Sequence, residues 1–206
     1  MPHCWRSNTF NRKKLPAYGH LEGRWENFLL GCVNCNSTKG KKDVLLDHIL
    51  LPDRDNTFLA FTYRPDGTVS PSAMAHAQGI GQRAADTLAL TGRDKRSSEV
   101  VDENGKRVSL DRVSQRLQTW ALAEETKAEI DANPGNESVR NLSVFLAQQS
   151  GFFSIWLTVF RDDPELCNRL IDAFAGTRES GCFDPVEASP VSPAPNPDGL
   201  AGGGKL

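Results

Sequence analysis

Two cysteines at C-x-x-C spacing constrain this chain more than any other feature. Cys32 and Cys35 lie in the segment W-E-N-F-L-L-G-C-V-N-C-N-S-T-K-G-K-K, residues 25–42. This spacing can place two thiolates on one side of a tight turn, an arrangement that supplies half of a tetrahedral zinc site. Thioredoxin-like redox chemistry and a turn with two unpaired cysteines are the alternatives, although the surrounding sequence lacks the β-α-β pattern of the redox fold.

Polar residues near the cysteines suit contact with phosphate groups. Asn36 directly follows the second cysteine, and Lys39, Lys41 and Lys42 come next. A zinc-stapled turn that leads into a helix would direct such side chains toward phosphates. A solvated run of charges explains the lysines equally well, and Asn27 and Asn36 are also of the type that caps helices and forms turns.

The same segment resembles the second half of an HNH endonuclease motif, in which W-x-N-L-L precedes C-x-x-C-N-x-x-K-G. The most similar branch is the one associated with retron and Septu-type anti-phage ATPases. The resemblance extends from about residue 13 to about residue 184, because W-L-T-V-F at residues 156–160 and the helix start after it are similar to the C-terminal part of that family. It implies a ββα-metal module at the N-terminal end of the fold.

The resemblance also implies a function, the hydrolysis of DNA phosphodiester bonds in phage defence. In this family a histidine acts as general base on water, a divalent cation such as Mg²⁺ stabilises the phosphoryl charge, and the central asparagine orients the histidine. Asn27 matches the central asparagine, and Asn36 matches the last motif position, which helps to hold the catalytic cation. Cys32 and Cys35 match half of the structural Zn²⁺ site. The implied partners are DNA and a defence-system ATPase.

The N-terminus departs from this pattern. Full members carry a C-x-x-C and an E-H-x-x-P-K segment upstream, and residues 1–12 contain neither. The catalytic histidine would fall near Thr9, His3 lies too far upstream, and His20 is expected to be a surface loop histidine. Because the base and half of the zinc ligands are missing, we expect this chain to be impaired as a nuclease.

A change of reading frame would explain the departure. With one permitted choice of codons for residues 5–14, the alternative frame reads A-V-E-H-V-Q-P-K-K, and it rejoins the chain if an adenine run differs by one base. Residues 1–12 would then be an aberrant N-terminus that did not evolve to fold with the rest, and Cys4 would not bind zinc. Sequencing of the adenine run in the gene tests this hypothesis.

Short elements are predicted between the motif and residue 107. Residues 44–51 suit a short helix or a segment that covers the zinc turn, with His48 exposed. Residues 57–63 are rich in β-branched and aromatic residues, and the turn that follows predicts a hairpin. An alanine-rich helix is expected over residues 73–90, although glycines weaken its middle. The charged residues 93–107 predict a mobile loop or a small hairpin.

Longer helices are predicted for the remainder. Ser109 is expected to cap a helix that ends at residues 133–135. Arg112, Arg116 and Lys127 are expected on or near its polar side, where they could contact DNA, although a solvated face is favoured. A second apolar stripe follows, and an almost wholly apolar helix is predicted to be buried. The last helix starts at Asp163, with proline in its first turn. The apolar face of the first of these helices consists of Leu110, Val113, Leu117, Trp120 and Ala121. The second stripe consists of Val139, Leu142, Phe145 and Leu146, and the almost wholly apolar helix covers residues 152–160.

These predictions give an α+β chain in four parts. Residues 1–12 are the aberrant N-terminus, residues 13–56 the partial ββα-metal (HNH) module, and residues 57–184 a short hairpin with a mainly helical domain. Residues 185–206 are rich in proline, glycine and serine, so we expect a disordered C-terminal tail.

Composition limits the other functional classes. The formal net charge of the 206 residues is −2, so nucleic-acid binding would depend on a local basic cluster. No apolar run reaches membrane-spanning length and no secretory signal is recognisable, so no membrane partner is expected. The five cysteines do not suggest a disulfide framework, which favours the cytoplasm.

Two functions from different classes remain open. The first is a metal-dependent HNH endonuclease that cuts DNA. The second is a catalytically inactive remnant whose helical part binds a partner. Zinc content separates them, because an intact site would hold near-stoichiometric zinc whereas Cys32 and Cys35 alone would bind it weakly.

Overall fold

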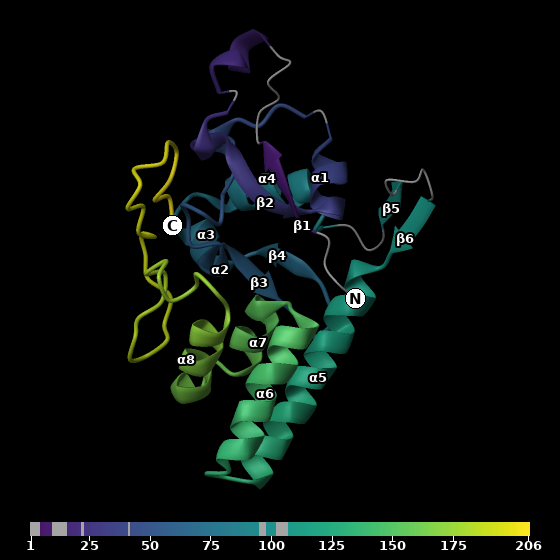
Figure 1. Ribbon diagram of the computed structural model, residues 1–206, viewed down its shortest axis with the longest axis vertical. Helices are drawn as coiled ribbons and strands as arrows, with labels where there is room; N and C mark the ends of the chain where they lie inside the picture. The colour runs from purple at the N-terminus through teal and green to yellow at the C-terminus, as the bar shows by residue number, and fades with distance from the viewer. Residues whose placement is uncertain (1–4, 10–15, 22, 41, 95–97, 102–106) are drawn as a thin grey trace.

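The computed structural model describes residues 5–9, 16–21, 23–40, 42–94, 98–101 and 107–206. Its long axis runs from the N-terminal elements at one end to a pair of long antiparallel helices at the other (Figure 1). Within the described residues the strands form three separate two-stranded antiparallel sheets, and helices make up most of the regular structure. The fold thus mixes helices with small sheets, in agreement with the expected α+β class.

The N-terminal elements follow the order strand, strand, helix. Strand β1 (Trp5–Thr9) pairs with β2 (Phe28–Cys32), and helix α1 (Val33–Lys39) begins directly after β2. Two 3-10 helices, η1 (Pro16–Leu21) and η2 (Trp25–Asn27), lie between the strands in the chain. Because α1 follows β2 without a loop, the end of the strand fixes where the helix starts.

The pairing of β1 differs from the expectation that residues 1–12 stand apart from the fold. Residues 5–9 form a regular antiparallel ladder with β2. Such a ladder uses backbone N–H and C=O groups, which nearly every residue type provides. The pairing therefore does not bear on the reading-frame hypothesis, which stays a prediction.

The central region contains the predicted hairpin. Strands β3 (Phe61–Tyr63) and β4 (Val69–Pro71) pair antiparallel, and Asp66 Oδ1 accepts hydrogen bonds from the backbone and side chain of Thr68 in the turn. The first part of the predicted strand is instead one helical turn, α2 (Thr57–Ala60). The expected short helix before it is the 3-10 helix η3 (Leu46–His48), with His48 exposed as predicted.

The single helix expected over residues 73–90 is two helices. Helix α3 (Ala73–Ala77) starts at Ser72, whose hydroxyl accepts the backbone N–H of Ala75, and α4 (Gly81–Thr91) follows. Gly79 between them has a φ of 71°, a conformation that glycine adopts without strain. The glycines that weaken the helical pattern therefore mark a real break.

A second hairpin and the longest helix come next. Strands β5 (Ser98–Val101) and β6 (Arg107–Leu110) form the small hairpin that was one of two expectations for this charged segment. Helix α5 (Arg112–Ala132) begins after it and ends at the predicted position. The predicted Ser109 cap is wrong, because Ser109 lies in β6 and Asp111 accepts the backbone N–H of Ser114 instead, at 2.9 Å.

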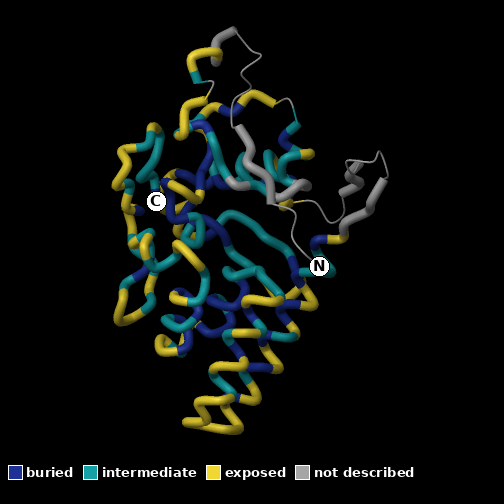
Figure 2. Tube along the Cα trace, viewed as in Figure 1, coloured by how far each residue is buried: buried dark blue, intermediate teal, exposed yellow. Residues whose placement is uncertain are grey.

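The helical core lies where α5 meets α6 (Glu137–Ser150), α7 (Phe153–Val159) and α8 (Pro164–Ala173), and buried residues concentrate there (Figure 2). Helix α7 is the predicted buried helix, and Trp156 at its centre is fully buried. Asp163 caps α8 as predicted, since its Oδ1 accepts the backbone N–H of Leu166 at 3.0 Å.

The apolar stripe predicted for α6 is only partly correct. Val139 and Leu146 pack against the helical core, whereas Leu142 and Phe145 are 57% and 55% exposed. A helix that meets its neighbours along a narrow line buries only part of a wide apolar face. The two exposed residues therefore form an apolar strip on the outside of α6.

The prediction of a disordered tail over residues 185–206 is wrong. This segment has little regular structure, yet it runs back along the molecule from α8 to the central region (Figure 1). Leu206 is buried in the cluster that contains Leu50 and Ala60, and its carbonyl accepts the N–H groups of Asn56 and Ala194 at 3.1 and 2.8 Å. Specific hydrogen bonds to the core thus compensate for a composition that is typical of disorder.

Across the described part of the chain, every helix is too short or too polar to cross a lipid bilayer.

Candidate functional site

The ladder between β1 and β2 places the expected base position beside Asn27. Thr9, the last residue of β1, lies opposite Phe28, the first residue of β2. Asn27 directly precedes Phe28 and ends η2. Because opposed residues of an antiparallel pair lie about 5 Å apart, the backbone at residue 9 is close to the start of β2. Thr9 and Asn27 therefore come together, although 18 positions separate them in the printed sequence.

Asn27 itself is held inside the structure. Its side chain is only 3% exposed, and its Nδ2 lies 3.4 Å from the carbonyl oxygen of Leu21, the last residue of η1. Its backbone N–H donates to the carbonyl of Arg24 at 3.0 Å. The asparagine thus connects η1 with the start of β2, and a fixed amide of this kind is able to orient a neighbouring polar group.

Arg54 fixes the same loop from the other side. It is buried, and its guanidinium donates to the carbonyl of Glu26 at 3.2 Å and to that of Ala201 at 2.9 Å, while Asp53 pairs with it at 2.8 Å. One side chain therefore joins η2 to the C-terminal segment. Nearby, the ion pair of Arg24 with Glu26 lowers the pKa of the Glu26 carboxyl, chiefly through their hydrogen bond.

Helix α1 carries the other predicted site residues. Cys35 and Asn36 are half-buried, and Lys42 just beyond the helix is exposed. Lys39 is only 9% exposed, so it differs from the solvent-facing phosphate contact that was expected. Lys41 lies outside the described residues.

The structure describes the backbone of both cysteines of the predicted zinc half-site, but not both of their side chains. Cys32 ends β2 and Cys35 lies in the first turn of α1, while the position of the Cys32 side chain is outside the described part of the structure. Among the described residues, no three or more His, Cys, Asp or Glu side chains gather as a metal site would require. The described residues therefore do not fit a complete tetrahedral zinc site or a carboxylate-rich cation site.

Helix α1 packs closely on the end of α4. Gly92 terminates α4 with a φ of 64°, and a Cβ atom at this position would lie 2.8 Å from Cγ2 of Thr38. Both the left-handed conformation and the close approach require glycine here. Gly92, which follows the motif by many positions in the sequence, thus allows α1 to pack closely on the end of α4.

Two arginines that the sequence assigned to a solvated surface are buried. Arg112 and Arg116 are 8% and 5% exposed, so that prediction is wrong. Arg112 Nη1 donates to the carbonyl of Thr91 at 3.1 Å, and Arg116 Nε donates to that of Gly67 at 2.5 Å. Lys127 also turns inward, where its Nζ donates to the carbonyl of Val159 at 3.2 Å.

The sequence contained a signal for this burial. Arg112 and Arg116 precede the buried Trp120 by eight and four positions, so all three lie on one face of α5. The pKa of the Arg116 guanidinium is lowered, first by burial and then by the positive charges of Arg93 and Arg112.

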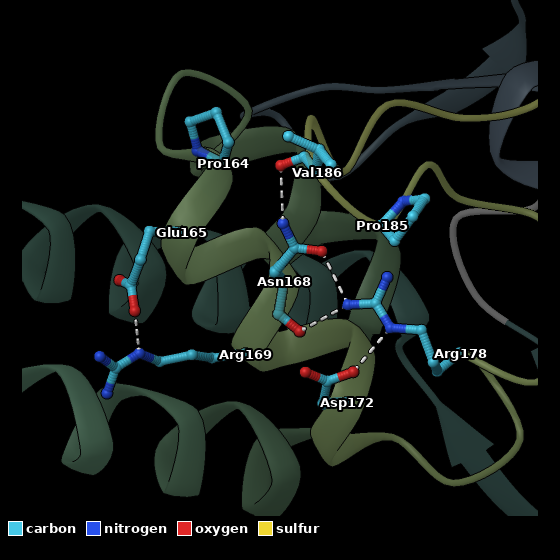
Figure 3. Close-up of a pocket in the computed structure, with 8 residues that line it drawn as sticks. All are labelled: Pro164, Glu165, Asn168, Arg169, Asp172, Arg178, Pro185 and Val186. Atoms are coloured by element: carbon cyan, nitrogen blue, oxygen red, sulfur yellow. Dashed lines mark hydrogen bonds and ion pairs between the residues drawn. The ribbon is translucent and has the colours of Figure 1, made fainter.

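A shallow groove between α8 and the segment after it holds a different charged network (Figure 3). Arg178 pairs with Asp172 at 2.7 Å and donates to the side chain of Asn168 at 2.7 Å. Arg169 pairs with Glu165 and with Glu137. Each arginine here has a carboxylate partner, so the groove presents balanced charges that tie α8 to its neighbours.

Comparisons with protein-family models, curated proteins and solved structures find no match. Function is therefore inferred from the residues and their geometry. The features available for that inference are the strand, strand, helix order around Asn27 and the buried arginines at the start of α5.

Proposed function

We propose that this chain carries an HNH-type endonuclease module that hydrolyses DNA phosphodiester bonds, and that its activity is impaired because Thr9 occupies the position of the general base. The observation that supports the proposal is the register of β1 and β2, which puts Thr9 opposite the residue after Asn27. The helix that follows carries Asn36, so the order of elements matches the ββα arrangement that the resemblance implies.

The roles follow from this arrangement. A base at residue 9 would take a proton from the attacking water, and the buried amide of Asn27 would hold that base in one orientation. A threonine hydroxyl is too weak a base for this step near neutral pH. Lys42, exposed next to α1, would contact the DNA backbone.

The metals that the resemblance implies play no part in these steps. A divalent cation would supply stabilisation of the phosphoryl charge, and zinc would staple the turn at Cys32 and Cys35. Because the described residues form neither site, the roles proposed above belong to protein side chains alone. The biological setting that we propose is phage defence beside an ATPase in the cytoplasm, and this part rests on the resemblance alone.

The second candidate is a catalytically inactive module that binds a partner protein. It is favoured by the exposed Leu142 and Phe145 on α6, since an apolar strip of this kind is a feature of protein contact surfaces. This candidate and the nuclease differ in whether any variant of the chain cuts DNA.

A plasmid-nicking assay with Mg²⁺ or Mn²⁺ tests the proposal. The chain as it stands is compared with the double variant Asn8→Glu/Thr9→His, which restores the Glu-His pair of the alternative frame. We expect nicking by the double variant and little or none by the original chain. Adding Asn27→Ala to the double variant should abolish nicking, whereas Asn141→Ala, a change on the exposed side of α6, should leave it unchanged.

Three other results would count against this account. Nicking by the original chain would show that another group acts as the base, and His20→Ala would then be tested first because His20 precedes the Leu21 that Asn27 contacts. Nicking that survives Asn27→Ala, in protein with an unchanged circular dichroism spectrum, would remove Asn27 from the mechanism. No nicking by any variant would favour the binding module.

A further inference from the structure

Among the described residues, two buried arginines at the start of α5 have no ionic partner of the kind that buried charges normally have. Arg112 and Arg116 are more than nine-tenths buried. The hydrogen bonds that the structure shows for them go to the backbone carbonyls of Thr91 and Gly67, which carry no net charge. Moreover, Arg112 Nη2 is buried and has no hydrogen-bond partner within the described structure.

This arrangement is energetically unfavourable without a further group. Burial of a charge is unfavourable unless the charge is paired, and a buried donor without a hydrogen-bond partner adds to that cost. Arg178 offers the contrast, because it also has a buried Nη1 without a partner but forms an ion pair with Asp172. At Arg112 and Arg116 the structure shows no such carboxylate among its described ion pairs.

Positive charge accumulates around the two arginines. The charges of Arg93 and Arg112 both contribute to lowering the pKa of Arg116, after burial, so each of them acts on the Arg116 guanidinium. Arg93, just beyond α4, is exposed and connects this cluster to the solvent. The N-terminal end of α5 adds the positive pole of a long helix.

Asp111, a described carboxylate whose charge acts on Arg116, has another role. Asp111 is exposed and caps α5, because its carboxylate accepts hydrogen bonds from the backbone N–H and the hydroxyl of Ser114. These bonds to Ser114 are the main reason why the pKa of Asp111 is lowered, and Arg116 contributes least among the causes. Asp111 thus neutralises the cluster only weakly.

We propose that Arg112 and Arg116 form a phosphate-binding site between the end of α4, the turn from β3 to β4 and the first turns of α5. A phosphate group would accept hydrogen bonds from Arg112 Nη2 and from the guanidinium groups beside it, and it would supply the missing negative charge. Guanidinium groups bind phosphate through parallel hydrogen bonds, which makes phosphate a better match than a chloride ion.

Two sources of the phosphate group fit the position of the site. Gly92, one residue before Arg93, contacts Thr38 of α1, and α1 and the first turn of α5 lie on the same side of the molecule (Figure 1). A DNA backbone at α1 would therefore pass near the cluster. A small phosphate compound bound on its own is the other source. Neither requires cleavage of DNA, so this site is independent of the proposed nuclease function.

The test uses inorganic phosphate and the full chain. Thermal unfolding is followed at increasing phosphate and, in parallel, at the same ionic strength of sodium chloride, for the original chain and for Arg112→Gln. Arg161→Gln, which removes an exposed arginine between α7 and α8, is the matched control. Titration calorimetry with phosphate gives the affinity directly. If Arg112→Gln does not fold, Arg112→Lys replaces it in the test, because lysine keeps the positive charge but lacks the paired N–H donors of the guanidinium group.

A phosphate-specific rise in the unfolding temperature is expected for the original chain and for Arg161→Gln, because a ligand that binds only the folded state stabilises it. In Arg112→Gln and Arg112→Lys the phosphate affinity should fall at least about tenfold, as expected for loss of hydrogen bonds to a charged group. Equal phosphate responses in the original chain and both Arg112 variants would overturn the proposal, as would the absence of any phosphate-specific response in the original chain.

Fluorescence anisotropy with a labelled DNA duplex identifies the source. If the site binds the DNA backbone, Arg112→Gln should weaken duplex binding and reduce the salt dependence by about one phosphate contact, and free phosphate should compete. If duplex binding is the same in both proteins while phosphate binding is lost in Arg112→Gln, the site serves a small phosphate compound. The phosphate-binding and duplex-binding results can be interpreted even if no variant nicks DNA, since neither experiment measures cleavage.

Discussion

The C-terminal segment should contribute to stability through Asp55, and the variant Asp55→Ala tests this. The Asp55 side chain is fully buried. Its Oδ2 accepts the backbone N–H of Leu51 at 2.9 Å, and its Oδ1 accepts that of Lys205 at 2.9 Å. The Lys205 ammonium group pairs with the same carboxylate at 3.3 Å. One carboxylate thus joins the central region to a residue 150 positions away.

The loss of free energy follows from these contacts. Asp55→Ala leaves two backbone N–H groups, those of Leu51 and Lys205, without their acceptor, and each costs about 1–3 kcal/mol when buried. The Lys205 ammonium, which is 10% exposed, also loses its counter-charge. Removal of one member of a buried pair costs about 3–5 kcal/mol. We therefore expect the free energy of unfolding to fall by about 4 kcal/mol, and the unfolding temperature by about 10 °C.

Urea unfolding followed by circular dichroism measures the change, with Asp162→Ala as the control because Asp162 is an exposed carboxylate at the start of the α8 region. The control should stay within about 0.5 kcal/mol of the original chain. Limited proteolysis should cut residues 185–206 faster in Asp55→Ala than in the original chain. A loss below about 1 kcal/mol, or equally rapid cleavage of this segment in both proteins, would refute the reasoning.

Two further predictions concern the helical core. Burial raises the pKa of the Cys167 thiol from 9.0 to about 12, so the contribution of the neutral thiol to stability is complete below pH 9 and is lost as the pH rises from 9 to about 12. Over that range the free energy of unfolding should fall more steeply than in Cys167→Ala, by up to about 1.4 kcal/mol per pH unit. Parallel pH profiles of the two proteins would contradict this prediction. Asp163→Ala should lower the free energy of unfolding by about 1–2 kcal/mol, because the cap at Leu166 and the bond from Arg140 are both lost. In the same urea experiment Asp163→Asn should recover most of the cap contribution, and equal losses in the two variants would exclude the cap as the cause.

Local patterns were sufficient for part of the fold. The almost wholly apolar run that becomes α7 has no polar face to turn toward water, so the burial of Trp156 was predictable from its composition. Asp163 and the proline after it specified the start of α8, since a cap and a fixed φ act within a few residues. The hairpin of β3 and β4 likewise follows from its turn residues.

Partners distant in the chain account for the predictions that failed. Arg112 and Arg116 read as surface residues because charge is normally solvated, yet Thr91, Gly67 and the packing of α5 place them inside. For the same reason Leu142 is exposed, because its burial depends on which side of α6 meets its neighbours.

For the candidate site, too, some features follow from the sequence and others only from the tertiary structure. The sequence alone supplied the identities of Asn27, Asn36 and the two cysteines, and through them the resemblance to the HNH motif. Only the tertiary structure brought Thr9 beside the start of β2, because the register of a ladder depends on the whole pairing and not on either strand alone.

What the sequence determined about this protein is therefore its local structure: the helix starts, the turns and the apolar faces whose signals lie within a few residues. What only the tertiary structure decided is which charges are buried and how residues 185–206 are held, through Asp55, Asn56 and Leu206. The physical reason is that a composition rich in proline and glycine lowers the tendency to form regular elements, but it does not prevent backbone groups from bonding to acceptors and donors that the rest of the fold presents.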